Sequence, residues 1–396
     1  MLIGIDASRA FLKNRTGIEE YSYQTIKNLK DKLNSHQVVL YIRKSQSQKV
    51  KKESFPTNWR IKVIRFPYLW TQVGLSLEML LHPVDVLFIP AHTVPLIHPA
   101  RNASLFTLAI FIQKILKTFR INTDYNRHGV EGGPKNTIVT IHGLEYEFCP
   151  QAYSFLERLY MRCSIKNSCK WASMIIAVSE NTKLDIMRMY SVDKKKIQVV
   201  YEGYAKNYKL QITNDKFEIS SKYLLFIGRL EERKNIINII KAFEILKERY
   251  GIPHKLVLAG KPGHGHEKIK SEMLNINCSK DIVELGFVSE EEKWQLLKKA
   301  DVFVFPTLYE GFGIPILEAQ SVGCPVVAAN NSSIPEVVQN SALMVDPQNA
   351  ENIAESVQRL ISDETLKNDI IQKGYENVKR FSWEKCAGHI ASLLNV

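Results

Sequence analysis

Short apolar runs alternate along this chain with longer stretches that repeat at helical spacing. The runs Leu2–Ile5, Val38–Ile42 and Val86–Ile89 carry apolar residues on both faces, as strands inside a parallel sheet do. After the first run come a polar loop with a glycine and then an amphipathic stretch, Ile18–Leu33. Because strand, loop and helix follow one another repeatedly, the pattern predicts an α/β protein with parallel sheets.

The alternation continues to the end of the chain, with a polar break near its middle. Residues 203–221 are polar and show no sustained periodicity, so we expect a linker there. At 396 residues the chain exceeds one ordinary core, which predicts two domains, residues 1–203 and 204–380. The last amphipathic stretch, Trp383–Leu394 within residues 381–396, has no strand after it and is expected to return across the first domain. Further strands are expected at Ile61–Arg65, Thr137–Ile141, Met174–Val178, Ile197–Val200, Tyr223–Ile227, Lys255–Ala259, Ile282–Glu284, Val302–Phe305, Val326–Ala328 and Ala342–Val345.

One amphipathic stretch, Ser104–Arg120, stands apart because its polar side is basic. It is too short to span a bilayer, but a basic amphipathic helix can lie in the membrane interface. The alternative is a helix packed on its own domain, and both interpretations fit the pattern. Residues 122–135, which follow, are expected to form an irregular loop.

Composition limits the partners and the compartment. The net charge of +12 favours acidic ligands, anionic lipid or nucleic acid, but the basic residues form no nucleic-acid recognition motif. The six cysteines show no metal-type or paired spacing, and neither do His264, His266 and Glu267, so no metal is expected. Scattered thiols, no leader and no apolar run of membrane-spanning length together predict a cytoplasmic protein.

The segment Glu310–Glu318 joins the apolar strand Val302–Phe305 to a helix. It runs EGFGIPILE, and its two glycines let backbone N–H groups approach a ligand closely. Pro315 suits the first turn of a helix, whose positive end attracts phosphate. Since carboxylates accept hydrogen bonds from hydroxyl pairs, the two glutamates indicate a ligand with hydroxyls and phosphate. The alternative is an ordinary strand–helix link with solvated glutamates.

Two cations stand at the start of another predicted helix, directly after the strand Tyr223–Ile227. Arg229 and Lys234 would lie at its positive end, where cations are unfavourable unless an anion neutralises them. This arrangement favours a phosphate site, with exposed surface cations as the alternative. Gly17 and His142 each follow a predicted strand, at the sheet edge where open α/β sheets bind ligands. Gly17 is equally well explained as a helix-entry residue.

The cation pair and the Glu-x7-Glu segment together resemble the large retaining glycosyltransferase family of the family 4 type, which includes sucrose synthase and many bacterial mannosyltransferases. Three further stretches resemble that family: the opening Gly-Ile-Asp-Ala with Thr-Gly-Ile before the first helix, the segment Thr140-Ile-His-Gly, and Ser332–Val338 with Ala342–Pro347. The resemblance covers nearly the whole chain. It implies the GT-B fold, in which two Rossmann-like domains face each other across a cleft, the first binding the acceptor and the second the nucleotide sugar.

The resemblance also implies a role for each matched residue. Arg229 and Lys234 would hold the diphosphate and stabilise its charge as the sugar leaves. Glu318 would bind the ribose, and Glu310 would position a sugar hydroxyl rather than act as a nucleophile. The remaining implied contacts are Gly17 and Gly228 near the diphosphate, His142 beside the transferred sugar, Gly311, Phe312 and Gly313 through backbone N–H groups, Leu317 through its amide at the phosphate, and Val288, after Phe287, near the base.

The implied activity is a retaining, metal-independent transfer of a hexose from a nucleotide-diphosphate sugar, with no other cofactor. GDP-mannose is the favoured donor and a UDP-sugar the second choice. The acceptor would be a growing or lipid-linked glycan in surface-polysaccharide assembly. The basic charge fits work at the inner face of the plasma membrane, with peripheral contact to anionic lipid. The alternative is a glycosyltransferase-like protein that binds a partner or glycan without turnover.

Two departures from the family pattern concern the acceptor side. Gly143 follows His142 where relatives often have Asp, and the segment between Pro99 and Lys135 is longer than in many relatives. Both lie in the domain that the resemblance assigns to the acceptor. The motifs therefore define the donor half of the reaction and leave the acceptor half open.

Overall fold

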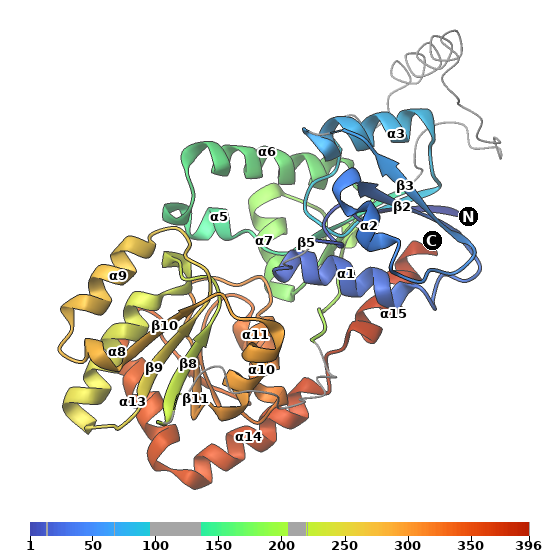
Figure 1. Ribbon diagram of the computed structural model, residues 1–396. Coiled ribbons are helices and arrows are strands. Elements are labelled where there is room, and N and C mark those ends of the chain that lie inside the picture. Colours follow the sequence, from blue (N-terminus) through green and yellow to red (C-terminus); the bar gives the residue numbers. More distant parts are fainter. Residues whose placement is uncertain (13–14, 67, 96–135, 205–218, 220, 396) are drawn as a thin grey trace.

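The structure is a computed structural model that describes residues 1–12, 15–66, 68–95, 136–204, 219 and 221–395. Two parallel sheets, each flanked by helices, form two lobes (Figure 1). The predicted α/β class with parallel sheets is therefore confirmed. The stretch Ser104–Arg120, the loop at 122–135 and most of the linker lie outside the described residues. Within the described part of the chain, no helix is both long and apolar enough to cross a membrane.

The first sheet has seven strands, and every neighbouring pair is parallel. In spatial order they are β3 (Trp59–Ile64), β2 (Gln37–Arg43), β1 (Leu2–Asp6), β4 (Val86–Ile89), β5 (Asn136–Ile141), β6 (Met174–Ala177) and β7 (Ile197–Val199). Its helices are α1 (Gly17–Leu29), α2 (Ser47–Val50), α3 (Ser76–Leu81), α5 (Glu145–Phe148), α6 (Phe155–Trp171) and α7 (Glu180–Tyr190), with a π-helical turn at Trp70–Leu75.

The second sheet has six strands, again all parallel. In spatial order they are β10 (Ile282–Gly286), β9 (Lys255–Ala259), β8 (Tyr223–Ile227), β11 (Val302–Phe305), β12 (Val326–Ala329) and β13 (Leu343–Val345). Its helices are α8 (Ile236–Tyr250), α9 (His266–Asn275), α10 (Glu290–Lys299), α11 (Ile314–Ser321), α12 (Ile334–Val338), α13 (Ala350–Ser362) and α14 (Glu364–Val378).

Apolar residues on both faces explain why the central strands were predicted well. In β4, Phe88 packs into one core cluster of the first domain, and Leu87 packs into the cluster on the opposite face. Neighbouring side chains of a strand point to opposite faces, so a strand covered by helices on both sides must be apolar throughout. The predicted bounds of β4, β8 and β11 match those of the structure.

The start of the helix after β8 was predicted wrongly. The sequence pattern placed it at Arg229, whereas the structure has a loop, a 3₁₀ turn at Glu232–Lys234 and only then α8. Asn235 separates the two with a left-handed backbone (φ 61°), and its side-chain amide donates to the carbonyls of Pro306 and Pro347. Asparagine adopts this conformation more readily than most residues. Lys234 therefore lies in the turn that precedes the helix.

The last helix, α15 (Trp383–Leu394), lies against α1 in the first domain. Trp383, Cys386 and Ile390 belong to the same buried cluster as strand residues of the first sheet, such as Ile5. Figure 1 shows α15, in red, crossing from the second lobe to the first. The chain therefore passes between the lobes twice, once after β7 and once before α15.

Candidate active site

The loop Tyr309–Gly313, between β11 and α11, lies where the two domains meet. A Cβ atom added to Gly311 would lie 1.5 Å from the carbonyl oxygen of His142, the residue that follows β5. Only glycine permits this approach of two backbones. The Gly311 carbonyl also accepts a hydrogen bond from the Thr182 hydroxyl of α7 (3.3 Å). The carboxyl ends of β5 and β11 thus face each other, and the predicted donor loop is in contact with the first domain.

Glu310 forms ion pairs with two neighbouring cations. Its Oε1 accepts a hydrogen bond from Nζ of Lys234 and lies 3.5 Å from the guanidinium of Arg233. Burial alone would raise the pKa of Glu310, but Lys234 and Arg233 outweigh it and hold the pKa below its usual value. Burial and the nearby Arg233 in turn lower the pKa of Lys234. Lys234 and Glu310, which the resemblance assigned to the diphosphate and to the sugar respectively, are therefore in direct contact.

Arg233 is a residue that the sequence did not reveal as part of this site. Its guanidinium donates to the carbonyl of Tyr309 (2.8 Å) and to Glu231 (2.9 Å), besides contacting Glu310. Its Nε is buried without a hydrogen-bond partner. Burial opposes its charge, but the nearby carboxylates, Glu310 first among them, raise its pKa. The adjacent Lys234 was a weak signal, since two successive cations before a helix suggest that both serve one anion.

Arg229 differs from the other two cations because it is exposed and pairs with none of the carboxylates that the structure describes. It follows Gly228 at the carboxyl end of β8 and runs beside the loop that contains Gly263. An exposed guanidinium presents donors that suit a phosphate group. Around this turn Arg233 and Lys234 meet the carboxylates of Glu231 and Glu310, with Glu145 also near Arg233, and Arg229 is the cation that stays exposed to an anion.

Glu318 lies on α11, where Oε1 accepts a hydrogen bond from Lys293 of α10 (2.6 Å). The side chain is buried, and burial raises its pKa despite the opposing charge of Lys293. Burial opposes the charge of Lys293 too, but Glu318 and Glu290 raise its pKa. The two glutamates of the Glu-x7-Glu segment therefore belong to separate ion pairs. Glu310 faces the cations after β8, and Glu318 faces α10.

Most of the other residues that the resemblance assigns to donor binding have buried side chains. Phe312 packs with Tyr201 and Phe381 in an aromatic cluster that also contains Leu317. Val288 is buried in the core of the second domain, while the preceding Phe287 is 57% exposed. Gly313 is the N-cap residue of α11 and has a positive φ of 113°. Any ligand contact from these positions would thus be made by backbone groups or by Phe287.

The first domain contributes the start of α1 and the end of β5. Gly17 is the first residue of α1, and a Cβ added to it would meet nothing within 4 Å, so this helix end is open. His142 is nearly buried, with Nδ1 2.9 Å from Glu202 and Nε2 2.8 Å from the carbonyl of Pro90. Both ring nitrogens of His142 therefore have acceptors within the protein, which fixes the ring beside Tyr21.

Two parallel-sheet domains that face each other, with cations and carboxylates gathered at the sheet ends between them, define the GT-B fold class. Two family models match the chain: "Glycosyltransferase Family 4" over residues 15–206 and "Glycosyl transferases group 1" over residues 211–377. Together they span nearly all of it. The chain belongs to this glycosyltransferase family.

Relatives and solved structures agree with that assignment. O-antigen chain mannosyltransferase B of Escherichia coli is 29% identical over 259 residues, which cover 64% of this chain and 68% of that protein. The capsular polysaccharide biosynthesis glycosyltransferase CapM of Staphylococcus aureus is 29% identical over 325 residues, covering 74% and 83%. Anabaena Alr3699/HepE, solved with UDP and glucose, has a TM-score of 0.69 at 16% identity, covering 100% of this chain and 99% of that one. WaaG, a lipopolysaccharide glycosyltransferase, has a TM-score of 0.61 at 12% identity over the same shares. These structural neighbours show the GT-B fold.

Proposed function

We propose that the protein transfers a hexose, with mannose favoured, from a nucleotide-diphosphate sugar to a glycan acceptor with retention of configuration. The observation that carries this proposal is the pairing of Arg233 and Lys234 with Glu310 at the domain junction, with the exposed Arg229 just before the same turn. Mannose is favoured because several matched relatives are described as mannosyltransferases of O-antigen synthesis. Structural neighbours solved with UDP or UDP-glucose make a UDP-sugar the second choice.

The cations supply the chemistry that departure of a diphosphate needs. As the bond between the sugar and the phosphate breaks, negative charge grows on the leaving group, and fixed cations stabilise it without reorganisation. Arg229 is free to meet the phosphate, and Lys234 can share its ammonium between Glu310 and an incoming anion. The transfer then requires no metal, since these side chains supply the positive charge.

Glu310 acts in this proposal by positioning rather than by nucleophilic attack. Its carboxylate is paired with two cations, which stabilise its negative charge and reduce its reactivity. A hydroxyl of the sugar can still donate to the second carboxylate oxygen. Retention of configuration then fits a front-side departure in which the leaving phosphate accepts the proton of the acceptor hydroxyl.

The acceptor, on this proposal, is a growing glycan, free or lipid-linked, in surface-polysaccharide assembly. Matched relatives are described in terms of O-antigen and capsule synthesis. Work in the cytoplasm, with peripheral contact to anionic lipid at the inner face of the membrane, fits the net charge of +12. The basic stretch Ser104–Arg120 is the proposed contact, and liposome co-sedimentation of a variant with polar residues at 111, 112 and 116 tests it.

Melting temperatures measured with a panel of nucleotides, followed by a turnover assay, test the proposed donor. GDP should raise the melting temperature more than UDP, because a ligand that binds only the folded state stabilises it by mass action. GDP-mannose should then be hydrolysed slowly in the presence of EDTA, and NMR should show the α-anomer forming first.

Glu318→Gln should raise the donor KM about 10-fold through one weakened charge-assisted hydrogen bond. Binding without any turnover would replace this proposal with a silent, glycan-binding protein.

A further inference from the structure

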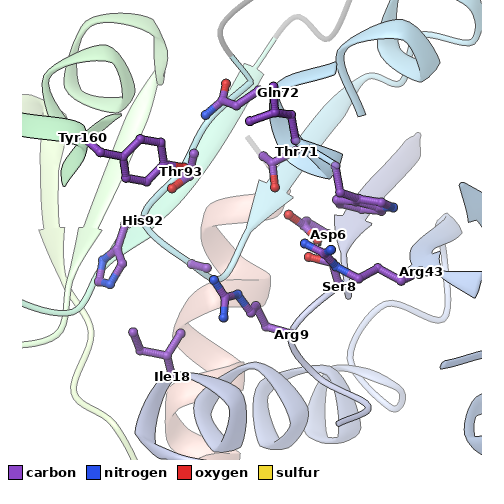
Figure 2. A pocket seen from close by; sticks show the side chains of 13 residues that line it. Asp6, Ser8, Arg9, Ile18, Arg43, Thr71, Gln72, His92, Thr93 and Tyr160 are labelled. Atoms are coloured by element: carbon purple, nitrogen blue, oxygen red, sulfur yellow. The ribbon is translucent and has the colours of Figure 1, made fainter. Parts of the chain in front are cut away.

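A cavity of about 300 Å³ lies in the first domain, at the carboxyl ends of β1, β2 and β4. Figure 2 shows its lining: Asp6, Ser8 and Arg43 on one wall, His92, Thr93 and Tyr160 opposite them, and Arg9 beneath. All the residues that line it belong to the first domain. The cavity is therefore separate from the donor-side cations around Glu310.

Arg43 is the feature of this cavity that calls for a ligand. Its side chain is partly buried and its guanidinium lies 5.5 Å from the ring of Trp70. The backbone N–H of Arg43 donates to Gln46 (2.9 Å), but among the described residues the guanidinium itself has no hydrogen bond or ion pair. Burial and, after it, the nearby Arg9 lower the pKa of Arg43, and the carboxylate of Asp6 opposes them more weakly. A guanidinium has five N–H donors, and leaving them unused while partly desolvated is unfavourable. An anion in the cavity would offset that cost.

The other charged groups of the lining leave room for an anion. Asp6 is the only acidic residue of the lining; its carboxylate accepts the N–H of Ser8 (2.9 Å), and burial raises its pKa. Burial, followed by the charge of His142, lowers the pKa of His92 to about 3, so this imidazole is neutral. Arg9 is paired with Glu19, which lies outside the lining, at 3.3 Å. Among the residues that the structure describes, Arg43 is thus the cation of the lining without an ion-pair partner, although the nearby Asp6 partly offsets its charge.

The uncharged groups of the lining suit a sugar ring. Hydroxyls of Thr71, Thr93 and Tyr160 border the cavity, and Trp70 and Tyr160 add aromatic surface. Hydroxyl groups both donate and accept, as recognition of a sugar requires. Aromatic rings pack against the apolar faces of ligands. Positive charge combined with these groups indicates a polyhydroxylated ligand that carries an acidic group.

The cavity adjoins the predicted reaction centre. Nδ1 of His92 accepts the backbone N–H of His142 (3.4 Å), and the two rings lie 5.3 Å apart. His142 in turn abuts Gly311 of the donor loop. A ligand in the cavity would therefore lie on the acceptor side of the transferred sugar.

We propose that this cavity binds the acceptor through an anionic group, a sugar carboxylate or a phosphate, with Arg43 as its main anchor. The proposal rests on the glycosyltransfer function proposed above and names the chemical class of its acceptor. It predicts that an acidic sugar binds better than its neutral counterpart. It also predicts that this preference depends on Arg43 and not on the general positive charge of the protein.

Titration calorimetry with matched probes tests the proposal directly. Saturating GDP and UDP would first fill the diphosphate site. Methyl glucuronide is then compared with methyl glucoside, and mannose 6-phosphate with mannose, so that the two pairs separate a carboxylate from a phosphate. We expect the acidic member of at least one pair to bind about 10-fold more tightly, as one charge-assisted contact of about 1.4 kcal/mol implies. Arg43→Gln should abolish that preference.

Lys44→Gln is the matched control, because Lys44 is an exposed cation next to Arg43 that does not line the cavity. It should keep the wild-type preference. Equal binding of acidic and neutral probes, no binding of either acidic probe, or a preference that survives Arg43→Gln would overturn the proposal. Arg43→Lys provides a second variant if the glutamine variant does not fold, and it should weaken the preference. Loss of nucleotide binding or turnover in the wild type concerns the proposed function instead, because these probes are measured without a donor sugar.

Discussion

The two sides of the domain junction use positive charge in opposite ways. On the donor side, Lys234 and Arg233 are already paired with Glu310, so the cations are fixed before any ligand arrives. On the side proposed for the acceptor, Arg43 borders an open cavity and has no ion-pair partner in the described part of the chain. A preorganised cation stabilises charge that develops during the reaction, whereas an unpaired one binds charge that the ligand brings with it. On the proposed function, the donor side would supply catalysis and the first domain would select the acceptor.

The largest effect should come from removing the donor-side ammonium. Lys234→Met keeps the length of the side chain but deletes its charge, so kcat/KM should fall about 10²–10³-fold, as for loss of one donor to a developing anion. The measurement is turnover of the donor sugar at saturating acceptor. Lys241→Met, an exposed change on α8, is the control. If Lys234→Met kept an activity within threefold of wild type, its ammonium would not stabilise the developing charge. The assignment of catalysis to the donor side would then be wrong.

A smaller effect is expected from changing Arg233, which donates to the Tyr309 carbonyl in the loop before α11. Arg233→Lys keeps the charge, but one ammonium cannot reproduce the planar contacts to Glu231, Glu310 and the Tyr309 carbonyl. We expect kcat to fall roughly 10-fold or more, with nucleotide affinity nearly unchanged, because a displaced positioning group affects the transition state more than binding.

Kinetics of Arg233→Lys beside Arg249→Lys test this expectation. Arg249 forms an exposed ion pair with Glu351 and offers the same substitution far from the loop. A rise in donor Kd that accounts for the whole loss would instead make Arg233 a binding residue. Equal behaviour of the two variants would mean that the contacts of Arg233 have no role in the reaction.

The donor side was also the more predictable side, for a physical reason. Glu310 and Glu318 lie in one segment, and Arg229 and Lys234 in another, so spacing along the chain reveals them. Arg233 was missed because its role depends on a tertiary contact to the carbonyl of Tyr309. The placement of Arg229 and Lys234 on a helix was wrong because the left-handed backbone of Asn235 delays α8.

The acceptor cavity was not predictable from spacing. Asp6 and Arg43 end β1 and β2, and His92 follows β4. Only the strand order of the sheet brings these three strand ends together. Apolar patterning predicted the strands, because burial on both faces is a local property of the sequence. It could not predict which polar residues at their ends would share one cavity. Strand order is set by packing between distant segments, so no local pattern encodes it.

The smallest effect concerns His92, the neutral histidine of the cavity, and the dependence of stability on pH. Burial, the charge of His142 and Arg9 lower the pKa of His92 to about 3, against about 6.5 in an unfolded chain. Between these values the unfolded state binds more protons than the folded state, so stability falls as the pH falls below about 6.5. At pH 5 the loss attributable to His92 should be about 2 kcal/mol relative to pH 8, as an order of magnitude.

Chemical denaturation gives the free energy of unfolding at pH 8 and at pH 5, and the loss is the difference between these two free energies. A substitution that changes stability equally at both pH values therefore cancels. His92→Asn should lose less stability on acidification than the wild type, by about that amount. His264→Asn, in the exposed loop after β9, is the control and should retain the wild-type difference. If His92→Asn lost as much stability between pH 8 and pH 5 as the wild type, His92 would take up a proton in the folded state. The acceptor cavity would then carry an additional cation at pH 5, and its contrast with the donor side would no longer depend on Arg43 alone.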